Sequence, residues 1–135
     1  MTRSLRYGLN AAALAVMMAA ALASAPAAKH VHLVRTDPMA DSTVRVLPRA
    51  IRLWFSAPVQ ISVTTVRLTG PDGIAVATAP AKMGEGLNAP VIAEVQCFLK
   101  PGRQSVAWRT MSRDGHAESG TFHFHIAAGA VAASR

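Results

Sequence analysis

The chain has 135 residues, 51% of them hydrophobic, and a formal net charge of +7. Its basic residues are scattered, and no aromatic residues interleave with a basic run, so the pattern argues against a nucleic-acid partner. The single cysteine, Cys97, excludes an internal disulfide. Its apolar neighbours predict that it fills space in a core.

The first 27 residues have the pattern of a secretory signal peptide. Arg3 and Arg6 precede a wholly apolar run over 11–23, and small residues follow in Ala25-Pro26-Ala27. The run is shorter than the about 18 residues that a membrane-spanning helix needs. An uncleaved anchor or an ordinary buried helix is the alternative, but the order of these features favours export. We therefore expect residues 1–27 to be removed and the protein to be periplasmic.

The rest of the chain is long enough for one domain with one core, which we expect over 28–127. Residues 128–135 are rich in alanine, and we expect them to form a flexible tail. Without the two arginines of the leader the net charge is +5, which is compatible with solvated sheet faces.

The expected domain is β throughout. Prolines recur about every ten residues, and apolar residues between them alternate with a period of two, which is typical of half-buried strands. Trp108 alternates with core positions, whereas Trp54 falls on a partly exposed face. Seven strands are expected, at 31–36, 51–55, 64–69, 74–76, 91–97, 105–111 and 120–127. This pattern predicts an all-β, seven-stranded Greek-key β-sandwich of immunoglobulin-like build.

Two groups of residues have the chemistry of metal ligands. A histidine at a chain's N-terminus can chelate a metal through its amine and ring Nδ1, and His30 and His32 lie near the expected mature start. In an extended segment Asp114 and His116 would point the same way, with Gly115 permitting close approach. Tetragonal nitrogen and oxygen coordination suits copper(II). The spacing alone, however, favours a plain β-turn followed by an exposed histidine.

A series of short motifs, in the same order along the chain, resembles the CopC family of copper-resistance proteins over almost all of residues 30–126. They are His30-Val31-His32-Leu33-Val34, Asp37-Pro38, Leu53 to Val59, Leu68 to Gly73, Pro101-Gly102, Val106 to Arg109, Ser112 to His116 and Ser119 to Phe124. The resemblance implies a cupredoxin-like or immunoglobulin-like sandwich that binds copper in the periplasm and carries or sequesters it. It also implies a partnership with an inner-membrane copper transporter of the CopD type.

The resemblance further implies that the bound ion is copper(II) and that His30, through its amine and imidazole, forms the site with Asp114 and His116. Lys29 is a departure from the family pattern, because cleavage before it removes the His30 amine from the chelate. His32, which a period of two places on the same strand face, would then substitute. The methionines after the leader are scattered, so the copper(I) site of methionine-rich relatives is not expected.

Two other functional classes are left open by the residues. A histidine-and-amine copper site can also activate oxygen, as in copper monooxygenases, and a metal-free immunoglobulin-like module would use Asp114-Gly115 only as a turn. His123 and His125 share an outward face of the last strand, as exposed residues or as a second, adventitious metal site.

Motifs of common enzymes are missing, among them Gly-x-Ser-x-Gly, a glycine-rich phosphate loop and His-Glu-x-x-His. Glu85, Glu94 and Glu118 are isolated in sequence and suggest no paired-carboxylate site. We therefore expect a binding protein rather than an enzyme.

Overall fold

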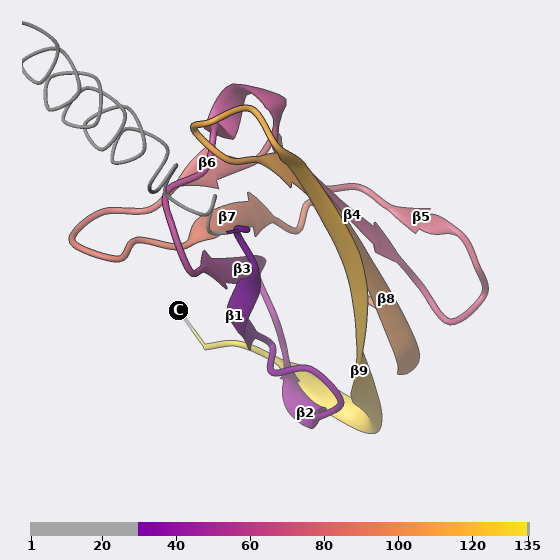
Figure 1. Ribbon diagram of the computed structural model, residues 1–135. Helices are drawn as coiled ribbons and strands as arrows, with labels where there is room; N and C mark the ends of the chain where they lie inside the picture. The colour runs from indigo at the N-terminus through magenta and orange to yellow at the C-terminus, as the bar shows by residue number, and fades with distance from the viewer. Residues whose placement is uncertain (1–29, 135) are drawn as a thin grey trace, which may run out of the picture.

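The computed structural model describes residues 30–134, in which nine strands form a two-sheet sandwich (Figure 1). One sheet has the strand order β1-β3-β7-β6, and the other has the order β2-β9-β8-β4-β5. The strands are β1 Leu33–Asp37, β2 Thr43–Leu47, β3 Ala50–Phe55, β4 Thr65–Thr69, β5 Ala75–Val76, β6 Lys82–Met83, β7 Val91–Glu94, β8 Gly102–Met111 and β9 Ala117–Ala132, with a 3-10 helix, η2, at Ile61–Val63. The expected all-β sandwich is confirmed.

The expected signal peptide, 1–27, lies outside the described residues, as does Lys29. Across residues 30–134, no helix has the length and apolar character needed to cross a membrane.

The core lies between the two sheets and consists of the alternate residues that the period of two predicts. Ile51 and Leu53 of β3 are fully buried, and they face Phe124 and Ile126 of β9 across the same core cluster. Full burial of a side chain of this size contributes about 1.5–3 kcal/mol. Trp108 is 9% exposed, as its alternation predicts. The sandwich is therefore held by apolar packing and by its strand ladders.

All seven expected strands are present, as β1, β3, β4, β5, β7, β8 and β9, and β2 and β6 are additional. Both additional strands lie at sheet edges. β2 pairs in parallel with β9, whereas β6 pairs antiparallel with β7 and has two exposed residues. Edge strands that bury few side chains carry little alternation, so the sequence pattern does not reveal them.

The expectation for Cys97 is wrong, because this residue is exposed. Strand β7 ends at Glu94 rather than at Cys97, and the chain beyond it turns its side chains toward solvent, with Phe98 93% exposed. Leu99 is the residue of this segment that enters the core cluster. An apolar run by itself does not show which of its members face inward.

The C-terminal strand extends past residue 127, where a flexible tail was expected. β9 continues to Ala132 because Val131 and Ala132 pair with Val46 and Leu47 of β2. The Arg49 guanidinium then donates a hydrogen bond to the Ala133 carbonyl over 2.6 Å.

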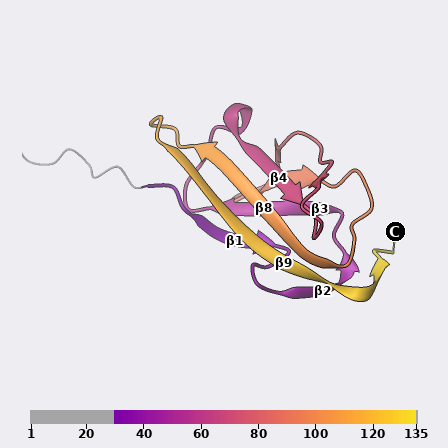
Figure 2. The ribbon, with the colours of Figure 1, turned by 90° about the vertical axis from the view of Figure 1, so that its right-hand side faces the viewer.

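The β8–β9 hairpin determines which residues meet at one end of the sandwich. The two strands pair continuously from Gly102 with Ile126 to Met111 with Ala117. Figure 2 shows the loop of this hairpin at the same end of the molecule as the start of the described chain. We call this region, which holds residues 112–116 and the segment 30–32, the hairpin end.

Close packing under the hairpin end requires a glycine at position 120. A Cβ atom there would lie 2.8 Å from Cζ2 of Trp108, whose ring also packs edge-on against Phe55 at a centroid distance of 5.2 Å. The indole is thus held between β3 and the backbone of β9.

We predict that Gly120→Ala lowers the free energy of unfolding by about 1–3 kcal/mol, because the added methyl group must displace the Trp108 ring. Urea denaturation followed by tryptophan fluorescence measures this change. Thr121→Ala, on the exposed opposite face of β9, is the control and should change stability by less than about 0.5 kcal/mol. Equal stability of the two variants would contradict the packing assignment.

Candidate metal centre

Val31 anchors the start of the described chain. Its side chain is 3% exposed, whereas His30 and His32 on either side are exposed. The His32 N–H donates to the Ser56 hydroxyl over 3.0 Å, and the Ser56 N–H donates to the His32 carbonyl over 2.9 Å. These contacts tie the segment to the end of β3, so the fold sets the position of the His30 backbone.

Residues 112–116 form a tight turn that joins β8 to β9. The Gly115 N–H donates to the Ser112 carbonyl over 3.0 Å, and the Ser112 N–H donates to the His116 carbonyl over 2.9 Å. Gly115 has φ = +89°, a conformation that glycine adopts without steric cost. The plain β-turn is therefore formed, and the extended segment considered for Asp114 and His116 is not.

The turn nevertheless brings Asp114 and His116 together. Oδ2 of Asp114 lies 3.1 Å from Nδ1 of His116, and both side chains are about half exposed. The Ser112 hydroxyl donates to the Asp114 carboxylate and accepts a hydrogen bond from the His116 N–H over 3.1 Å. The hydrogen bond from Ser112 holds the pKa of Asp114 below its usual value, desolvation opposes it, and His116 also lowers the pKa.

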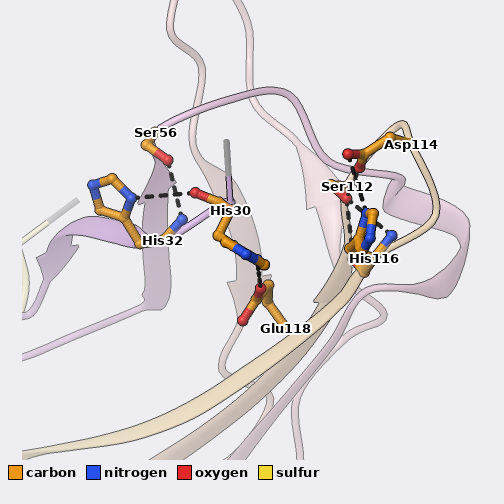
Figure 3. Close-up of polar contacts among 7 residues, drawn as sticks. All are labelled: His30, His32, Ser56, Ser112, Asp114, His116 and Glu118. Carbon is orange, nitrogen blue, oxygen red and sulfur yellow. Dashed lines mark hydrogen bonds and ion pairs between the residues drawn. The ribbon is translucent and has the colours of Figure 1, made fainter. Parts of the chain in front are cut away.

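His30 lies near Asp114 and His116 in space, although it is more than 80 residues away from them in the sequence. Its ring lies 6.1 Å from the His116 ring, centroid to centroid, with the planes at 74°. Its Nδ1 lies 3.1 Å from Oε1 of Glu118, the second residue of β9. Figure 3 shows two imidazole–carboxylate pairs side by side, His30 with Glu118 and His116 with Asp114.

His32 does not join this group. Its Nδ1 is 3.5 Å from the His30 carbonyl, and its ring points away from Asp114 and His116 in Figure 3. Of the four sequence-predicted ligands, His30, Asp114 and His116 thus lie together and His32 does not.

His30, Asp114 and His116 of the hairpin end, together with Glu118 beside them, offer two imidazoles and two carboxylates, a donor set that suits copper(II). Within residues 30–134, no three His, Cys, Asp or Glu side chains already surround one point closely enough to hold an ion. Each imidazole is instead turned toward a carboxylate. The His30 side chain is 76% exposed and that of His116 is 55% exposed, so both rings have room to rotate toward an ion.

Glu118 was missed as a member of this group because it is isolated in sequence. Its place in the alternation of β9 was the available signal, since positions 118, 120, 122, 124 and 126 share the core-facing side. Glu118 is on that side and only two residues after the 112–116 turn, so its carboxylate must lie at the rim of the sandwich.

The other histidines lie apart from this site. The His123 ring shares a hydrogen bond with the Ser105 hydroxyl, with 2.7 Å between Nδ1 and Oγ. His125 is exposed two residues further along β9. In the described part of the chain no further His, Cys, Asp or Glu completes a metal site with them. His123 therefore has a hydrogen-bond partner, and within residues 30–134 the two histidines have no third ligand.

Comparisons with known proteins relate the whole domain to copper-resistance proteins. Residues 33–127 match the CopC domain family. The chain is 33% identical over 124 residues to protein YobA of Escherichia coli strain K12. The aligned region covers 92% of this chain and 95% of that protein. It is 32% identical over 120 residues to copper resistance protein C of Xanthomonas campestris pv. juglandis, covering 82% and 91%.

Two solved structures share the fold. One is CopC from Methylosinus trichosporium OB3b, with a TM-score of 0.64 and 24% identity, covering 78% of this chain and 98% of that one. The other is PcoC, a methionine-rich copper resistance protein from Escherichia coli, with a TM-score of 0.60 and 29% identity, covering 72% and 98%.

We predict that Ser112→Ala raises the pKa of Asp114 toward its ordinary value, because the hydroxyl that stabilises the charged carboxylate is removed. Carboxyl carbon chemical shifts of the metal-free protein, followed as pH is lowered, measure the change. Ser119→Ala, an exposed serine on β9, should leave the Asp114 titration unaltered. An unchanged midpoint in Ser112→Ala would mean that the hydroxyl does not act on Asp114.

Proposed function

The chain belongs to the CopC family, and on that basis we propose that it is a periplasmic copper(II)-binding protein that carries or sequesters the ion in copper resistance and homeostasis. The family match over residues 33–127 and the identity to copper resistance protein C support copper as the bound ion.

We place the ion among His30, Asp114 and His116. The observation that carries this assignment is that His30 lies beside the Asp114–His116 pair. The centroids of the His30 and His116 rings are 6.1 Å apart, although the two residues are far apart in the sequence. Imidazole and carboxylate ligands favour copper(II) over copper(I), which prefers thiolate and thioether sulfur. Met39 lies in the turn after β1, Met83 in β6 and Met111 at the end of β8, so the described methionines form no Met-x-x-Met cluster in sequence.

A binding role fits the place of these residues. The side chains of His30 and His116 are more than half exposed at one end of a rigid sandwich, where a second protein can approach the ion. Such access suits transfer of copper, and an inner-membrane transporter of the CopD type is the partner that we propose. The expected leader over 1–27 supports export to the periplasm.

We expect Asp114→Ala and His116→Ala each to weaken copper(II) binding on the order of 100-fold or more, because each removes one of the few ligands. Competition titration with a chromophoric chelator measures the affinity, and visible absorption and EPR report the loss of the native site. His125→Ala is the matched control, since it removes an exposed histidine of β9 far along the strand from the hairpin end.

His125→Ala should bind copper(II) as tightly as the unaltered protein. The assignment fails if Asp114→Ala and His116→Ala both keep the original affinity and spectrum. A protein that turns over oxygen or peroxide with ascorbate when loaded with copper would favour the oxidase class instead.

We predict that the exported protein has the mass of the chain without residues 1–27. Cleavage after Ala27 places Ala28 and Lys29 before His30, so the His30 amine becomes part of a peptide bond and is not a ligand. Intact-mass spectrometry of protein from the periplasmic fraction measures the start directly. A mass equal to the full chain would contradict export by cleavage, and a start at His30 would restore the amine to the site.

A further inference from the structure

Glu118 occupies an unusual place for an acidic residue in this fold. It lies on the core-facing side of β9, two residues before Gly120 and four before the buried Phe122, yet it remains 30% exposed because it is at the rim. Its Cα is paired with that of the buried Thr110 on β8. The strand ladder thus holds its backbone rigidly, and its carboxylate reaches out to the hairpin end.

The partner of Glu118 is a histidine rather than a fixed cation. Among the described residues, three other acidic side chains make ion pairs with lysine or arginine: Asp37 with Arg52, Asp72 with Lys100, and Glu94 with Lys82. Within the same part of the chain, neither Glu118 nor Asp114 has a lysine or arginine nitrogen within 4.0 Å. Each of these two carboxylates therefore faces an imidazole instead of a lysine or arginine, an arrangement that leaves it available to a bound cation.

The chain also needs a fourth ligand if His30 is not its first residue. A tetragonal copper(II) site takes four donors in a plane, and His30, Asp114 and His116 supply three side chains. His32, the substitute that its sequence position suggests, has its ring directed away from the group. The Glu118 carboxylate, by contrast, is already 3.1 Å from Nδ1 of His30.

We propose that Glu118 is the fourth protein ligand of the copper(II) site, in place of an N-terminal amine. The inference rests on the proposed function, since it assumes that copper(II) binds among His30, Asp114 and His116. In the metal-free protein the same carboxylate orients the His30 ring, and both groups turn to the ion when it binds.

Glu118→Gln tests this proposal because the amide keeps the size of the side chain and an oxygen that can accept a hydrogen bond from His30, but removes the charge. We expect copper(II) affinity to fall at least about 10-fold. We also expect the copper hyperfine coupling and g values in the EPR spectrum to change, because a carboxylate oxygen leaves the copper plane. Glu94→Gln, which alters a glutamate in the other sheet, should match the unaltered protein in both measurements.

His116→Ala and the unaltered protein are measured beside these variants, all as the mature protein and at the same pH. The proposal is overturned if Glu118→Gln keeps the original affinity and EPR spectrum while His116→Ala loses both, and the proposed function then stands. It is also overturned if Glu118→Gln binds more weakly but has the original spectrum, because Glu118 is then a positioning residue for His30. If the unaltered protein binds no copper(II), the proposed function itself fails, and the assignment of Glu118 fails with it.

Thermal unfolding of the metal-free proteins separates these outcomes from a damaged fold. Glu118 is a partly exposed rim residue and not a member of the apolar core cluster, so Glu118→Gln should unfold within about 2–4 °C of the unaltered protein.

Discussion

Burial of Val31 at the rim of the sandwich is the contact on which the candidate site depends. With this side chain 3% exposed and the His32 backbone bonded to Ser56, the start of the domain is held in place. The consequence is long-range, because His30 then meets a glutamate 88 residues later in the chain. The candidate site therefore depends on the folded sandwich, because its residues come from the segment before the first strand and from the last hairpin of the domain sequence.

The carboxylates of Asp114 and Glu118 have different partners from those of Asp37, Asp72 and Glu94. Asp37, Asp72 and Glu94 are paired with flexible lysine or arginine side chains, and solvent screens exposed pairs of that type, so they contribute little to stability. Asp114 and Glu118 instead face imidazoles that can exchange a hydrogen bond for a metal bond. The Ser112 hydroxyl keeps the pKa of Asp114 low, so this carboxylate stays charged and ready to receive a cation.

Much of the fold is predictable because alternation is a local property of each strand. Ile51 and Leu53, and Phe122, Phe124 and Ile126, face inward as their spacing indicates. The edge strands β2 and β6 were not predictable in this way, since they gain their backbone partners from β9 and β7 and bury few side chains. Cys97 shows the same limit, because an apolar run does not reveal where a strand ends.

For the candidate site, the sequence by itself determined the residue types on offer: an early histidine, an Asp-Gly-His turn and methionines that are not clustered. Only the tertiary structure decided that Asp114 and His116 meet through a turn, that His32 points elsewhere, and that Glu118 bonds to His30. The physical reason for this division is that residue type and local spacing are properties of the sequence itself. The meeting of its two ends depends on how the sheets pack, and that packing places a rim carboxylate beside a histidine 88 residues away.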